Sequence, residues 1–176
     1  GHLTDYRTGV AGSIATSTLA SPESKTVAMI GTGVQARMQL FSLLKVMPNI
    51  QTLQVWGRSE SGMAKYIKEV KELYPNLNVV ACENAQVAVS NADIIYTVTY
   101  SEKPIIKADW IKKGAHITAV GACEPSMQEL DPKILAMADI VCTDSIEACA
   151  KNGELHHALD MGYIEQDKVF ELGEAI

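Results

Sequence analysis

Residues 26–36 read Thr-Val-Ala-Met-Ile-Gly-Thr-Gly-Val-Gln-Ala, and they give the strongest indication of how the chain folds. The apolar, β-branched run predicts a buried strand over Thr26–Ile30. A G-x-G-x-x-A spacing follows it directly and opens an amphipathic helix, which is the context of a dinucleotide-binding turn. In such a turn Gly31 permits the tight bend, Gly33 lets the backbone approach a pyrophosphate, and Ala36 allows close packing of helix on strand.

The amide groups at the start of that helix are expected to hold the diphosphate. The residues proposed for this contact are Gly31, Thr32, Gly33, Val34 and Gln35. The alternative is a glycine-rich turn that binds no ligand.

Outward from this turn, short apolar runs alternate with longer stretches whose apolar residues recur every three or four positions. The predicted strands are Thr26–Ile30, Thr52–Trp56, Asn78–Ala81, Asp93–Thr97, His116–Val120 and Ile140–Thr143. Because helices separate most of these runs, the pattern predicts a Rossmann-like α/β fold. Its doubly wound, mostly parallel sheet should have about six strands, preceded by an extra N-terminal helix.

The helices are predicted from their apolar stripes and their boundary residues. The first helix begins after Gly33, and its predicted buried residues are Ala36, Leu40, Leu43, Leu44 and Met47. The second helix has Ser59 as its N-cap, and its predicted buried residues are Met63, Ile67, Val70 and Leu73. A third is expected at roughly 84–91, and others cover Thr4–Ala20, with Tyr6, Val10, Ile14 and Leu19 apolar, and Glu154–Met161.

Length and composition narrow the class of protein. The chain has 176 residues, 47% of them hydrophobic, and a net charge of -6, which suits one domain and argues against nucleic-acid binding. No apolar stretch is long enough to span a membrane, so we expect a cytoplasmic protein. The four cysteines and four histidines show no metal-site spacing, and no metal is expected.

The end of the second predicted strand bears on the choice of cofactor. Proteins that bind NAD usually place a carboxylate there, but this chain has Arg58 and Ser59. A guanidinium and a hydroxyl suit a 2′-phosphate, so NADP(H) is favoured, with NAD(H) as the alternative. The alternative is that Arg58 is a solvated surface charge and that Ser59 only caps the next helix; the cap at Ser59 is also compatible with cofactor binding.

Further cofactor contacts are expected where the later strands end, because ligands of open α/β sheets lie outside the carboxyl ends of the strands. Hydroxyls and a glycine in these places suit the ribose and nicotinamide of a cofactor, although Thr and Ser are also common in turns. The residues are Thr97, Thr99, Ser101, Val120 and Gly121.

Four segments together resemble the ornithine cyclodeaminase and mu-crystallin family. They are Leu3–Gly9 (L-T-D-Y-R-T-G), Gly31–Arg37 (G-T-G-V-Q-A-R), Ala92–Thr99 (A-D-I-I-Y-T-V-T) and Val120–Asp131 (V-G-A-C-E-P-S-M-Q-E-L-D). The resemblance implies that residues 1–176 are a single dinucleotide-binding domain from a two-domain, homodimeric protein of about twice this length. We expect an N-terminal helix in 1–22, a Rossmann core in 23–150 and a helical tail in 151–176.

The resemblance also implies roles at the substrate. Arg7 matches the arginine that grips the substrate carboxylate; a surface arginine paired to Asp5 or to solvent is the alternative. Ornithine cyclodeaminases have an Asp and a Lys where this chain has Cys123 and Met127. Neither can supply a charge, and the neighbouring Glu124 is the candidate replacement, or else an exposed loop carboxylate.

These departures favour hydride transfer at the α-carbon of an amino acid or cyclic imino acid, as in a ketimine reductase or an amino-acid dehydrogenase. Ornithine cyclodeaminase, a non-catalytic NADP(H)-binding protein and a Rossmann-like domain without nucleotide remain alternatives. Because the resemblance places part of the active site outside this chain, the 176-residue piece is expected to bind cofactor without appreciable catalysis.

Overall fold

The computed structural model describes residues 2–175. These residues form two compact units: one contains residues 2–99 and 110–120, and the other contains residues 100–109 and 121–175. The sequence predicts one domain with three segments, and that organisation stays a prediction.

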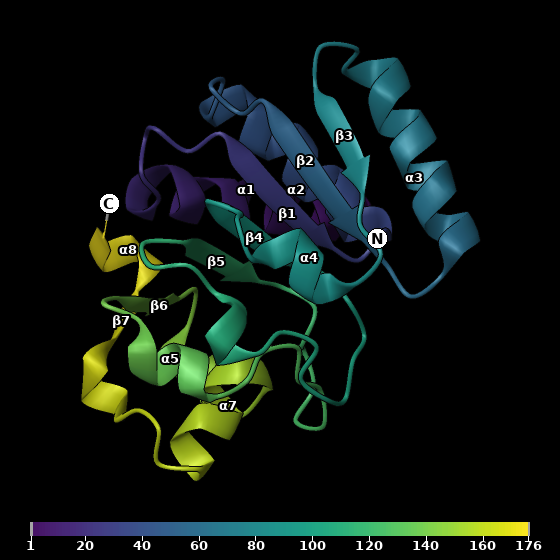
Figure 1. Cartoon of the computed structure of the whole chain (residues 1–176). Coiled ribbons are helices and arrows are strands. Elements are labelled where there is room, and N and C mark those ends of the chain that lie inside the picture. Colours follow the sequence, from purple (N-terminus) through teal and green to yellow (C-terminus); the bar gives the residue numbers. More distant parts are fainter. Residues whose placement is uncertain (1, 176) are drawn as a thin grey trace. The chain divides into compact units, whose positions relative to one another are not determined.

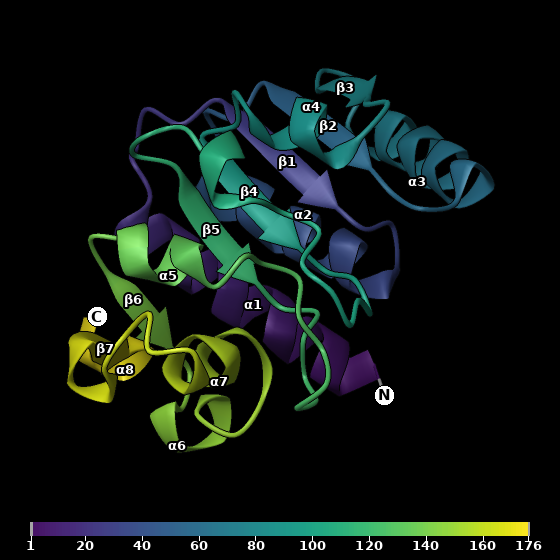
Figure 2. The ribbon, with the colours of Figure 1, turned by 60° about the horizontal axis from the view of Figure 1, so that its bottom comes forward.

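The first unit is built on a parallel sheet of five strands (Figures 1 and 2). The strands are β1 (Thr26–Ile30), β2 (Thr52–Trp56), β3 (Asn78–Ala81), β4 (Ile94–Thr97) and β5 (His116–Ala119). Their order is β3-β2-β1-β4-β5, so the winding direction changes between β1 and β4. The predicted doubly wound fold is therefore confirmed, and its switch point lies beside the end of β1.

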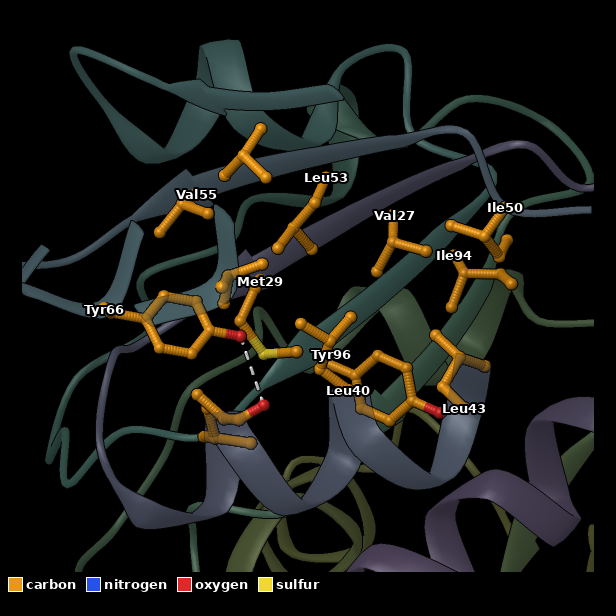
Figure 3. Packing of buried hydrophobic residues seen from close by; sticks show 14 of the residues in the cluster. Val27, Met29, Leu40, Leu43, Ile50, Leu53, Val55, Tyr66, Ile94 and Tyr96 are labelled. Atoms are coloured by element: carbon orange, nitrogen blue, oxygen red, sulfur yellow. Dashed lines mark hydrogen bonds between the residues drawn. The ribbon is translucent and has the colours of Figure 1, made fainter. Parts of the chain in front are cut away.

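Four helices accompany this sheet: α1 (His2–Leu19), α2 (Val34–Val46), α3 (Glu60–Leu73) and α4 (Ala85–Val89). Val27 and Met29 of β1 face a core to which α2 and α3 also contribute (Figure 3). The alternate residues Ala28 and Ile30 are equally buried, on the opposite face of the strand. Burial on both faces explains why β1 is a continuous apolar run.

The stripe predicted for α2 is confirmed, since Ala36, Leu40, Leu43 and Met47 are buried and Leu44 packs against them. For α3 the prediction was wrong at one position. Leu73 is 72% exposed, whereas the unpredicted Tyr66 is fully buried.

The side of α1 that is buried is not the side that carries the apolar residues named in the prediction. Tyr6, Val10 and Ile14 are exposed. The buried positions are instead the small residues Gly9, Gly12, Ser13 and Thr16, and α1 packs along α2. A Cβ on Gly9 would lie 2.8 Å from the carbonyl oxygen of Met38, so the two helices approach as closely as glycine allows.

The sixth predicted strand forms but does not join the main sheet. In the second unit β6 (Val141–Thr143) pairs in parallel with β7 (Val169–Glu171), a strand that was not predicted. This unit also contains α5 (Lys133–Met137), α6 (Ile146–Cys149), α7 (Gly153–Asp160) and α8 (Leu172–Ala175); short 3₁₀ turns occur at Ala108–Trp110 and Gln166–Lys168. Among the helices described over residues 2–175, none is both long enough and apolar enough to cross a membrane.

Candidate functional site

Gly31 bends the chain sharply after β1. Its φ of +111° is a conformation that favours glycine, and its N–H donates to the carbonyl oxygen of Trp56 at 2.8 Å. A Cβ at this position would lie 2.8 Å from the carbonyl oxygen of Val98, at the end of β4. A side chain here would therefore separate β1 from β4 at the switch point.

Gly33 is the N-cap of α2, and as a glycine it has no side chain with which to cap this helix. The first amide groups of a helix lack intrahelical partners, and together with the helix dipole they favour an anion. A Cβ on Gly33 would meet no atom within 4 Å, so the space beside Gly33 at the start of this helix is open. By contrast, Ser59 caps α3 and Asn84 caps α4. The turn therefore fits the diphosphate of a dinucleotide.

The carboxyl ends of β4 and β5 carry the other predicted contacts of the first unit. The N–H of Val98 donates to Ile30, and the N–H of Val120 donates to the carbonyl of Thr97, each at 2.9 Å. Thr97 is fully buried, whereas Thr99 and Val120 are partly exposed. Thr97, Thr99 and Val120 thus lie where β1, β4 and β5 end, as the sequence predicts.

A hollow of about 570 Å³ lies at the end of β2. Its lining includes Trp56 and Arg58, together with the carboxylates of Glu60 and Glu83. Arg58 is exposed. Ser59 accepts the N–H of Gly62 at 3.2 Å, so its predicted role as a helix cap is confirmed. Glu83 follows β3, and no motif in the sequence singled it out.

Arg7 lies on the exposed side of α1 and makes no ion pair within residues 2–175. Its alternative partner Asp5 instead accepts a hydrogen bond from Gln35 of the turn, at 3.3 Å. The guanidinium is therefore available to a carboxylate, on a helix that contacts the predicted cofactor turn.

Buried hydroxyls fix the position of α1. The Oγ1 of Thr16 lies 2.6 Å from the hydroxyl of Tyr96 and 3.1 Å from Oγ1 of Thr118. Thr118 in turn bonds Nε2 of His116 at 2.9 Å. Burial raises the pKa of Tyr96 to about 12, despite hydrogen bonds from Thr16 and Thr118 that lower it. Burial also lowers the pKa of His116 to about 4, so this network is neutral at physiological pH.

The remaining predicted residues belong to the second unit. The Oγ of Ser101 donates to the carbonyl of Lys103 at 2.6 Å and so closes a local turn. Gly121 donates its N–H to Oε2 of Glu129 at 2.8 Å. Cys123 and Glu124 are exposed, and Cys123 is a free thiol.

Sequence reasoning missed a pair of carboxylates in this unit. Glu129 is fully buried, and its own N–H donates to Glu154 at 2.6 Å. Glu154 also accepts the N–H of Leu130, at 3.1 Å. Burial raises the pKa of Glu154 to about 7, and the charge of Glu129 acts in the same direction, while the amides of Glu129 and Leu130 oppose both. Since 25 residues separate the partners, no local pattern signals the pair.

Next to this pair the backbone approaches α7 closely. Gly153 has a φ of +67°, and a Cβ there would lie 2.3 Å from the carbonyl oxygen of Ala122. Gly121 and Ala122 are therefore held by one carboxylate and one glycine contact within the second unit.

A parallel, doubly wound sheet with an uncapped helix N-terminus at its switch point defines the class of Rossmann-like nucleotide-binding proteins. Within that class the chain belongs to the ornithine cyclodeaminase/mu-crystallin family, whose model matches residues 1–176. The resemblance deduced from the sequence is thereby confirmed.

Three relatives illustrate the family. An uncharacterized cyclodeaminase, y4tK, of Sinorhizobium fredii is 38% identical over 177 residues, covering 100% of this chain and 53% of its own length. An archaeal alanine dehydrogenase, a dimer with bound NAD, has a TM-score of 0.91 at 35% identity, over 98% of this chain and 52% of its own. The Δ1-pyrroline-2-carboxylate reductase of Thermococcus litoralis, in complex with NADH and L-proline, has a TM-score of 0.93 at 30% identity. The match covers 99% of this chain and 54% of the reductase chain. The chain thus spans about half the length of these relatives.

Proposed function

We infer that this chain is the dinucleotide-binding part of an oxidoreductase that transfers hydride at the α-carbon of an amino acid or cyclic imino acid. The observation that carries this proposal is the uncapped N-terminus of α2, with open space in front of Gly33 at the switch point. The solved relatives bind NAD or NADH, and one of them also holds L-proline, the product expected of a cyclic imine reduction.

The residues of the first unit divide into three roles. Gly31, Thr32, Gly33, Val34 and Gln35 hold the diphosphate through their backbone, and Thr97, Thr99 and Val120 contact the nicotinamide half. Arg7 anchors the substrate carboxylate. The bound nicotinamide supplies or accepts the hydride, and the chain supplies orientation. In the second unit Ser101 and Gly121 remain predicted cofactor contacts, and Glu124 and Cys123 remain predicted substrate contacts.

For the cofactor we favour NADP(H) over NAD(H). The support is Arg58, which lines the hollow after β2 with an exposed guanidinium. A 2′-phosphate would accept charge-assisted hydrogen bonds from it. Glu60 and Glu83 line the same hollow and favour ribose hydroxyls over a phosphate, which keeps NAD(H) as the alternative.

Ornithine cyclodeamination is the second candidate activity, because a cyclodeaminase is among the relatives. It is disfavoured at Cys123 and Met127, where the family's cyclodeaminases have an Asp and a Lys. A binding protein without turnover is the third candidate. The whole protein is proposed to be a homodimer, as the archaeal alanine dehydrogenase is a dimer.

The test uses the protein encoded by the complete reading frame around this chain. We expect it to oxidise NADPH or NADH in step with the reduction of a cyclic imine such as Δ1-pyrroline-2-carboxylate. An Arg7→Met variant should raise KM for the imine far more than KM for the dinucleotide. Ammonia release from L-ornithine without net change in the dinucleotide would favour the cyclodeaminase. Tight binding without turnover on a panel of imines and amino acids would favour the binding protein.

A further inference from the structure

Arg37, on the first turns of α2, folds its side chain back onto the glycine turn. Its Nη1 donates to the carbonyl oxygens of both Thr32 and Gly33, each at 2.8 Å. These are the carbonyls of the two peptide units that flank Gly33.

Two residues of α3 hold the guanidinium in this place. Glu69 accepts from Nε of Arg37 at 2.8 Å and pairs with Nη2 at 2.5 Å. The guanidinium carbon also lies 5.3 Å from the centre of the Tyr66 ring, in cation–π range. Tyr66 is fully buried and donates its hydroxyl to the carbonyl of Ala36 at 3.2 Å. The guanidinium is thus fixed on three sides.

The geometry of the peptide bond converts this anchoring into the direction of two amides. In a planar trans peptide the C=O and the N–H point in opposite directions. The carbonyl of Thr32 shares its plane with the N–H of Gly33, and the carbonyl of Gly33 shares its plane with the N–H of Val34. Because Arg37 holds both oxygens from one side, both N–H groups point away from it.

The guanidinium also removes two carbonyl oxygens from the surroundings of a bound anion, where their partial negative charge would repel it. Glu69 neutralises Arg37, so the pair adds little net positive charge to the turn. The contribution of Arg37 is therefore geometric. A lysine, whose ammonium is a point charge on a flexible stem, could not serve two carbonyls and Glu69 in one plane.

We propose that Arg37, held by Glu69 of α3, is a positioning residue that orients the Gly33 and Val34 amides toward the diphosphate of the cofactor. This role rests on the proposed function. It makes α3 part of the phosphate-binding apparatus, although α3 supplies no group to the diphosphate itself.

The test compares three ligands on the 176-residue chain: NADPH, ADP-ribose, which keeps the diphosphate but lacks nicotinamide, and adenosine, which lacks phosphate. In Arg37→Met the affinity for NADPH and for ADP-ribose should fall by the same factor, about tenfold or more. The reason is that the Gly33 and Val34 amides are no longer held in the direction of the diphosphate. Adenosine binding, measured by competition, should not change. Arg37→Lys should keep the charge but not restore the affinity.

Glu69→Gln weakens the contact that holds the Arg37 guanidinium but leaves the guanidinium itself in place. This variant therefore tests the proposal even if Arg37→Met does not fold. Its control is Glu72→Gln on the same helix, where an exposed carboxylate lies 4.0 Å from Lys68. Glu69→Gln should weaken ADP-ribose binding and Glu72→Gln should not.

The outcomes separate this proposal from the proposed function. If the unmodified chain binds neither NADPH nor ADP-ribose, the proposed function fails, and the role of Arg37 fails with it. If the unmodified chain binds them and the Arg37 and Glu69 variants lose thermal stability without losing affinity, the role is structural and the proposal is overturned. Full affinity in Arg37→Lys would overturn it as well, because charge alone would then suffice.

Discussion

Replacing Glu154 by Gln should remove a pH dependence that this carboxyl imposes on stability. Burial raises its pKa from 4.5 to about 7. The unfolded chain therefore releases the proton near pH 4.5, while the folded chain retains it until about pH 7. In that window the unfolded state binds fewer protons, so the free energy of unfolding falls as pH rises. The shift corresponds to about 3 kcal/mol between the two ends of the window.

His116 hides this effect in the unmodified chain. Burial lowers its pKa from 6.5 to about 4, so the unfolded state binds the extra proton between these values and stability rises with pH. The contributions of Glu154 and His116 are opposite in sign and similar in size over most of the same range. A nearly flat stability profile of the unmodified chain is therefore expected and carries no information about either group.

The difference between two proteins isolates Glu154. Urea unfolding followed by circular dichroism, at steps from pH 4 to pH 8, gives the free energy of unfolding of the unmodified chain and of Glu154→Gln. The variant should gain stability relative to the unmodified chain as pH rises, by about 3 kcal/mol across the window. The hydrogen bond that Gln cannot accept lowers the variant's stability by a constant amount and leaves this trend unchanged. Glu147→Gln, an exposed carboxylate on α6, should show no such trend. A difference that does not vary with pH would refute the burial argument for Glu154.

Three further predictions concern the first unit. Gly9→Ala should lower the melting temperature, because overpacking against the Met38 carbonyl costs about 1–3 kcal/mol. The control Thr18→Ala, on the exposed side of α1, should leave the melting temperature unchanged. Equal melting temperatures of the two variants would contradict the close contact between α1 and α2. His116→Asn should lose stability relative to the unmodified chain as pH rises from about 4 to 6.5, by about 3 kcal/mol, because only the unmodified chain has the favourable contribution of His116 that grows over this range. Urea unfolding in which the difference between the two proteins does not vary with pH would exclude this role of His116. Arg58→Asp should weaken NADPH about tenfold more than NADH in calorimetric titrations, and equal losses would mean that Arg58 does not contact the 2′-phosphate.

The turn between β1 and α2 could be predicted because its signals are local. Strand, glycines and helix follow one another within residues 26–46, and each acts on its immediate neighbours. The cap at Ser59 is equally local, since its hydroxyl accepts the N–H of Gly62 three residues later. Such features need no knowledge of the rest of the chain.

What the sequence did not reveal depends on distant partners. The inner face of α1 is set by the close approach of Gly9 to Met38, so small residues outweigh the apolar stripe. Val141 pairs with Val169 instead of joining the main sheet, because a strand later in the chain offers a partner. The carboxylate of Glu154 is placed by amides far from it in sequence. None of these contacts leaves a periodic pattern in the sequence.

We propose that a dinucleotide diphosphate lies against the N-terminus of α2. Titrating the ¹⁵N-labelled chain with NADPH and following its backbone amide signals would show whether the cofactor binds at these amides. We expect the amide signals of Gly33, Val34 and Gln35 to shift most strongly and to saturate together. A Gly33→Val variant, whose side chain fills the open space beside the turn, should show no such shift. Saturable binding that leaves these three amides unmoved, or no binding at all, would contradict this proposal.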